Sequence, residues 1–168
     1  MKKYLTVCAG ALFMVGLSGC GDPSLDEIKE KIVKVETRNA SYTAVNKKTG
    51  AYGKYQILPS TGKFYAKKLN IPVSQWRTPE NQERIFEALL QDNIDQLKKQ
   101  GLDIDAFTVY GCHQQGANGF VCIMKNENLT KKFHIKLRRN LPPQYRNVDP
   151  NDLRKTWINY WKNKMEEV

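Results

Sequence analysis

Apolar residues recur at helical spacing near the start of the chain's polar body. Leu25, Ile28, Ile32 and Val35 lie three or four positions apart and therefore share one face of a helix. The helix opens at Ser24 with Ser-Leu-Asp-Glu, the pattern of a capping box in which a hydroxyl and a carboxylate satisfy free backbone amides. The sequence predicts a helix that begins after Ser24 and buries one face.

The next segment loses this period. Residues 37–61 are rich in Gly, Asn, Thr and Tyr, a composition that predicts a loop with a short β-hairpin around Ala44 to Gln56. Helical patterns then return at 60–69, 79–100, 103–113, after the turn at 116–119, and from 149 onward. The expected fold class is α+β, mostly α-helical, in a single domain over residues 24–168 with a C-terminal helical extension from about 129.

The first residues have the pattern of an export signal. Lys2 and Lys3 precede an apolar stretch over residues 4–15, which is too short for a comfortable membrane span. It ends in Leu-Ser-Gly-Cys at Cys20, which resembles the bacterial lipobox. We therefore expect a signal peptide over residues 1–19, lipid on Cys20, a tether over residues 20–23, and a lipid-anchored protein in the cell envelope that faces the periplasm.

The chain is strongly basic, with 27 Lys and Arg against 17 Asp and Glu and a net charge of +10. An export signal makes nucleic acid a poor partner for this charge. A basic cluster near the C-terminus is compatible either with anionic lipid headgroups and wall polymers or with a solvated surface. Its members are Lys131, Lys132, Lys136, Arg138 and Arg139.

The cysteines and histidines give no metal-binding pattern. Neither Cys-x-x-Cys nor His-Glu-x-x-His occurs, so we expect no metal and no cofactor. Cys112 and Cys122 form an even pair in an oxidising compartment, so they are either a disulfide or two free thiols.

Glu36 is the candidate catalytic group. It follows the apolar stripe of the first helix, so part of its surroundings is apolar and burial raises the pKa of its carboxyl. A carboxyl that stays protonated near neutral pH can protonate a glycosidic oxygen. The downstream run from Gly50 to Pro59, GAYGKYQILP, supplies tight turns and room beside it.

Three features of this chain resemble, in the same order, the motifs of the soluble-type lytic transglycosylase family. They are Glu36, this glycine-rich run and the later His-Gln-Gln-Gly from His113 to Gly116. The resemblance covers roughly residues 24–125. It departs at Thr37, where the family commonly has Ser, and at His113 and Gln114, where the family has Tyr and Asn. It implies a lysozyme-like fold with a small β region beside the catalytic Glu.

The resemblance also implies a mechanism and a substrate. Glu36 would act as general acid and then as base on the glycan strands of peptidoglycan, leaving 1,6-anhydro-muramic ends without a second carboxylate. Residues 37–55 contain no Asp or Glu, which favours this reaction over hydrolysis. The residues expected to contact substrate are Tyr55, Gln56, Tyr110, His113 and Gln114.

Several of these residues have ordinary alternatives. Tyr55 is equally compatible with a half-buried position and Gln56 with a turn amide. His113 is expected to contact substrate or to orient Glu36, and its ordinary alternative is a structural histidine. Two other functions stay open: a hydrolytic muramidase that uses one of the aspartates, and a non-catalytic peptidoglycan-binding component of a secretion, conjugation or phage-related assembly. The aspartates considered are Asp92, Asp95, Asp103 and Asp105.

Overall fold

The computed structural model describes residues 23–37 and 39–168. Within them the chain forms seven α-helices: α1 Leu25–Glu36, α2 Pro59–Lys68, α3 Pro79–Lys99, α4 Ala106–Gln115, α5 Ala117–Met124, α6 Lys131–Arg139 and α7 Leu153–Glu166. Two 3-10 turns, Val73–Gln75 and Pro143–Tyr145, lie between them. The predicted signal peptide over residues 1–19 and the predicted lipidation site Cys20 lie outside the described residues.

The mostly helical expectation is confirmed. The helices predicted at 60–69, 79–100 and 103–113 begin and end within about three residues of the observed ones, and the last helix begins four residues later than predicted, at Leu153. The capping box of α1 is present: the Ser24 hydroxyl accepts from the Glu27 amide at 3.2 Å, and the Glu27 carboxylate accepts from the Ser24 amide at 2.8 Å. Ile28 and Ile32 of the predicted stripe are buried. Local sequence signals therefore set where α1 begins and which face it buries.

The predicted hairpin between Ala44 and Gln56 is wrong. In its place the described residues contain two isolated antiparallel bridges, Val45 with Tyr52 and Tyr52 with Ile57. The backbone has positive φ at Gly50, Gly53 and Gln56 (73°, 80° and 49°), so the chain reverses direction every few residues and no ladder can extend. The segment is a folded loop rather than a strand pair.

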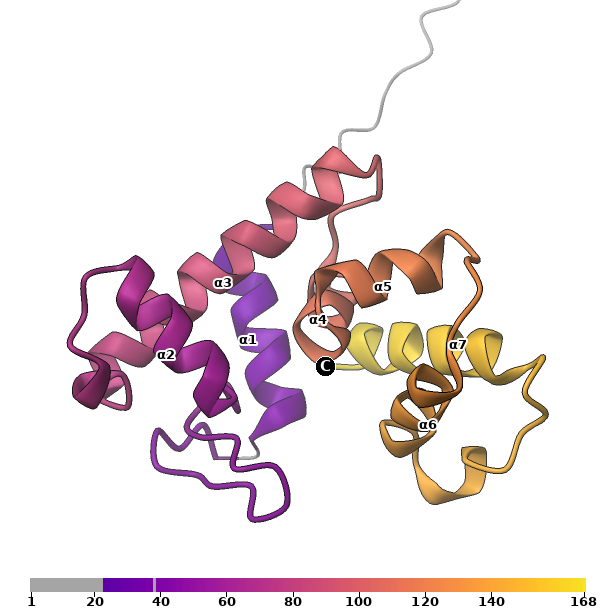
Figure 1. The fold of residues 1–168 in the computed structure, drawn as a ribbon, viewed down its shortest axis with the longest axis horizontal. Coiled ribbons are helices and arrows are strands. Elements are labelled where there is room, and N and C mark those ends of the chain that lie inside the picture. Colours follow the sequence, from indigo (N-terminus) through magenta and orange to yellow (C-terminus); the bar gives the residue numbers. More distant parts are fainter. Residues whose placement is uncertain (1–22, 38) are drawn as a thin grey trace, which may run out of the picture.

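The helices enclose one hydrophobic cluster that runs from α1 to α7. In Figure 1, α2 and the loop lie on one side, α5, α6 and α7 on the other, and α1 and α4 between them. Helix α4 contacts α1, α3, α5 and α7. The C-terminal extension belongs to this cluster, since Leu137 of α6 and Trp157 of α7 are both fully buried.

Trp157 gives a test of how firmly the extension is held. The ring lies near Phe107, Phe120 and Trp161, so Trp157→Ala leaves a large cavity and is expected to lower the free energy of unfolding by about 3–5 kcal/mol in urea denaturation. Lys155→Ala, on the exposed face of the same helix, is the matched control and should change it by less than about 0.5 kcal/mol. A loss below about 1 kcal/mol for Trp157→Ala would contradict this packing.

Candidate functional site

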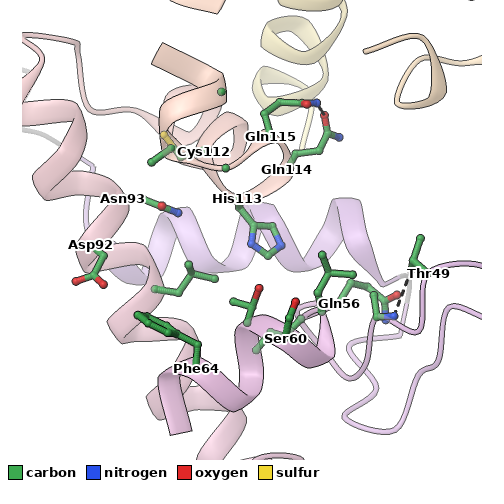
Figure 2. A pocket seen from close by; sticks show the side chains of 18 of the residues that line it. Thr49, Gln56, Ser60, Phe64, Asp92, Asn93, Cys112, His113, Gln114 and Gln115 are labelled. Atoms are coloured by element: carbon green, nitrogen blue, oxygen red, sulfur yellow. Dashed lines mark hydrogen bonds between the residues drawn. The ribbon is translucent and has the colours of Figure 1, made fainter. Parts of the chain in front are cut away.

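A cavity of about 940 Å³ lies where the end of α1, the loop, α2, α3 and the α4–α5 turn meet. We call it the central cavity. Figure 2 shows side chains from α2, α3 and α4 converging on it, with His113 reaching toward Ser60 and Gln56. Glu36 and His113, predicted from motifs far apart in the sequence, both line its wall.

Glu36 is the last residue of α1, and its side chain is only 22% exposed. Burial raises the pKa of its carboxyl to about 7, and a hydrogen-bonding interaction with the Tyr110 hydroxyl offsets part of this rise. At neutral pH the carboxyl is therefore present in both protonation states. It can donate a proton and can also accept one.

His113 lies beside Glu36 as a neutral side chain. Burial lowers the pKa of its imidazole to about 4, although a hydrogen bond with the Tyr55 backbone acts in the opposite direction. Nε2 is 3.1 Å from the Tyr55 carbonyl oxygen, which can only accept, so Nε2 carries the proton. The 3.9 Å separation from Nε2 to Glu36 Oε1 is therefore no ion pair, and the imidazole does not hold the carboxyl ionised.

Tyr110 and Gln114 form a directed hydrogen-bond chain behind the carboxyl. The Gln115 amide donates to Gln114 Oε1 at 3.0 Å, and the Gln114 amide donates to the Tyr110 hydroxyl oxygen at 3.1 Å. The Tyr110 hydroxyl hydrogen is thereby left free, and the hydroxyl and the Glu36 carboxyl are near enough to shift each other's pKa. Gln114 lines the central cavity, whereas Tyr110 is 2% exposed and supports Glu36 from within the core.

Gln56 lines the central cavity and also holds the loop together. Its side-chain amide donates to the carbonyls of Gly53 at 2.9 Å and Ala44 at 3.5 Å. Thr37, which directly follows the acid, donates its hydroxyl to the Lys54 carbonyl at 3.0 Å and so ties the end of α1 to the same loop. Both residues fix the loop against the helix that carries Glu36.

The prediction that Tyr55 contacts substrate is not supported by its position, because its side chain does not line the central cavity. The ring stacks on that of Phe86, with the ring centroids 3.8 Å apart. The hydroxyl donates to Glu83 at 2.7 Å on the other side of the loop. Although burial of Glu83 raises the pKa of its carboxyl, its hydrogen bonds outweigh burial and bring the pKa to about 2. This carboxylate anchors the Tyr55 side chain, and the Tyr55 carbonyl positions His113.

Asp92 is the only other carboxylate among the described residues that line the central cavity. It accepts from Lys68 Nζ at 2.6 Å and from the Tyr65 hydroxyl at 2.8 Å. Burial raises the pKa of Asp92, but these contacts outweigh burial and lower it overall. The other aspartates considered from the sequence do not line the cavity, and Asp105 instead caps α4.

Of the two alternatives that the sequence left open, the structure has two free thiols at Cys112 and Cys122. Cys112 faces the central cavity, where burial raises the pKa of its thiol to about 12. Cys122 belongs to α5 and interacts with Glu127, which raises the pKa of that thiol. Cys112 on α4 is buried and Cys122 on α5 is partly exposed, so the two thiols have different surroundings.

Several cavity residues carry no signal that local sequence patterns could reveal. They come from three helices that meet only in the folded chain: Phe64 of α2, Asn93 and Gln96 of α3, and Lys136 of α6. Phe64 is 61% exposed, an apolar side chain at the cavity wall. The sequence indicates Lys136 only as a member of the basic cluster near the C-terminus.

Comparisons with models of protein families, with curated proteins and with solved structures find no match. Among residues 23–37 and 39–168, no helix is long and apolar enough for a membrane span. In the same part of the chain, no three His, Cys, Asp or Glu side chains come together in a group that would hold a metal ion.

The buried carboxyl predicts a specific pH dependence of stability. The folded-state pKa of Glu36 is about 7, above its ordinary value of 4.5, so this group stabilises the fold fully below about pH 4.5 and loses that contribution as the pH rises through 7. Glu36→Gln cannot ionise. It should be more stable than wild type by about 2–3 kcal/mol at pH 8 and nearly equal to it at pH 4.

Urea denaturation of both proteins from pH 4 to pH 8 measures this difference. Subtracting the two curves cancels the opposite contribution of His113, whose lowered pKa destabilises the fold as the pH falls. A difference that stays constant with pH would mean that Glu36 has an ordinary pKa.

Proposed function

We propose that this chain is a lytic transglycosylase with a lysozyme-like fold that cleaves the glycan strands of bacterial peptidoglycan. The observation that carries the proposal is Glu36: a carboxyl at the end of α1, on the wall of a cavity of about 940 Å³, with a pKa raised to about 7 by burial. The order of the motifs around Glu36, Gln56 and His113 agrees with this function.

The proposed reaction uses one carboxyl twice. Glu36 donates its proton to the glycosidic oxygen between N-acetylmuramic acid and N-acetylglucosamine as the C1–O bond breaks. The resulting carboxylate then takes the proton from the 6-hydroxyl of the muramic residue, whose oxygen bonds to C1. The product has a 1,6-anhydro ring and no water is consumed. A pKa of about 7 suits both steps.

The neighbours of Glu36 are proposed to position it and the sugar. The Tyr110 hydroxyl steadies the carboxylate that forms after the first step. Neutral His113 does not pair with that carboxylate, so Glu36 remains basic enough to accept the second proton. Gln56 and Gln114 present polar atoms to substrate at the cavity wall, while Tyr55 acts only through its carbonyl.

A hydrolytic muramidase is the second candidate, and Asp92 is the observation that favours it. A hydrolase needs a second carboxylate as nucleophile or as base for water. Asp92 lines the same cavity and is held in its ionised form. Lys68 and Tyr65 already occupy its carboxylate, and for this reason we favour the transglycosylase.

We further propose that the protein acts in the cell envelope, anchored by lipid on Cys20 and facing the periplasm. The tether from Cys20 to the start of α1 at Leu25 spans at most about 17 Å, so the domain stays near the membrane and reaches nearby glycan. Enzymes of the resembled family serve secretion, conjugation or phage structures, and such an assembly is a proposed partner.

Digestion of purified peptidoglycan by the full chain in detergent tests the reaction. Wild type should release glycan ends that mass spectrometry identifies as 1,6-anhydro-muramic acid, and Glu36→Gln should lower the rate by about 10²–10⁴-fold. Asp92→Asn is the matched carboxylate control and should keep most of the activity.

The contrary outcomes separate the alternatives. Reducing ends that disappear in Asp92→Asn would identify a hydrolase. A folded wild-type protein that binds peptidoglycan and releases no product, with binding unchanged in Glu36→Gln, would identify a non-catalytic wall-binding component.

A further inference from the structure

Helix α6 brings one member of the basic cluster into the central cavity. Lys136 lines the cavity wall together with Asn140 of the same region, whereas Lys131, at the start of the helix, does not. Lys136 Nζ donates to the Gln115 carbonyl at 2.9 Å and lies 5.9 Å from the centre of the Phe133 ring. These contacts hold the ammonium at the end of α4, beside the α4–α5 turn.

The charge of Lys136 has no acidic partner within the described part of the chain. Among the cavity-lining carboxylates there, Asp92 is paired with Lys68, and burial favours the neutral form of Glu36. An ammonium has three donors, of which the Gln115 carbonyl takes one. Burial also lowers the pKa of Lys136, as expected for a cation that is partly removed from water without a counter-charge.

The same end of the cavity carries an acceptor without a partner. Gln115 is 5% exposed, and its side-chain Oε1 is buried with no hydrogen bond from any described residue. Buried polar atoms are nearly always satisfied by protein, water or ligand. A ligand group that bears both a carboxylate and amide N–H donors would match these two features, because the carboxylate would pair with the Lys136 ammonium and an N–H would donate to Gln115 Oε1.

We propose that Lys136 forms a carboxylate-binding subsite that recognises the acidic substituent of the muramic residue. This inference rests on the proposed function, because it names the part of the glycan that the cavity distinguishes. The carboxylate has two possible sources: the acidic stem peptide, or the lactyl group itself in strands that lack peptide. Neutral glycans such as chitin have neither, so Lys136 favours peptidoglycan over them.

Binding to three probes tests the subsite. Calorimetry uses the full chain in detergent with Glu36→Gln, so that no probe is cleaved. The probes are peptide-bearing glycan strands, strands from which an amidase has removed the peptides, and neutral N-acetylglucosamine oligomers. Lys136→Gln is compared with Lys131→Gln, a matched loss of charge on the same helix outside the cavity.

Lys136→Gln should weaken binding of a carboxylate-bearing strand by about three- to tenfold, a range typical of a partly exposed charge pair, and leave the neutral oligomer unchanged. The loss should shrink with added salt. Lys131→Gln should change none of the three. A loss for peptide-bearing strands alone would identify the stem peptide, a loss for the peptide-free strands alone would identify the lactyl carboxylate, and a loss for both would show that Lys136 binds either carboxylate.

Two results would overturn the subsite while leaving the proposed function intact: equal affinity for the acidic probes in both variants, or a loss in Lys136→Gln of the same size for all three probes. Failure of every probe to bind the folded Glu36→Gln protein would overturn the proposed function together with this inference.

Discussion

The site depends on one constraint: the carboxyl of Glu36 is removed from water without a positive charge among the described residues to compensate it. Raising the pKa from 4.5 to about 7 corresponds to about 3 kcal/mol that favours the protonated form. A cationic neighbour would cancel this effect, and burial keeps the adjacent His113 neutral. The fold loses this free energy when Glu36 ionises. The same preference for the protonated form makes Glu36 a proton donor near neutral pH.

The surrounding elements maintain this state through contacts that join distant segments. Glu83 of α3 holds the Tyr55 hydroxyl, and the Tyr55 carbonyl accepts from His113 of α4, which fixes the imidazole tautomer. Gln114 leaves the Tyr110 hydroxyl available to Glu36. The irregular loop therefore lies between α1 and α4. Its backbone carbonyls accept hydrogen bonds from buried donors, so the loop is packed from both sides.

The sequence is informative where structure follows from local spacing. Ile28 and Ile32 have a helical period, and Ser24 and Glu27 are a cap pair, so α1 and the apolar side of Glu36 could be predicted. The loop has no such period: positive φ at Gly53 and Gln56 changes side-chain directions, so neither its lack of strands nor the direction of Tyr55 could be read from residue order. Lys136 lines the cavity through a contact between segments distant in sequence, its hydrogen bond to the Gln115 carbonyl, which residue order does not reveal. The number of residues between Cys112 and Cys122 likewise does not determine in which directions their side chains point.

The most direct test of this account is an NMR titration of the Glu36 side-chain carboxyl with ¹³C-labelled protein, assigned by comparison with Glu36→Gln. We expect a single transition with a midpoint near pH 7, and Tyr110→Phe should move the midpoint upward because it removes a group that lowers the pKa of the carboxyl. A midpoint between about pH 4 and 5 would contradict the account, since the carboxyl would then be ionised at neutral pH and unable to serve as the proton donor.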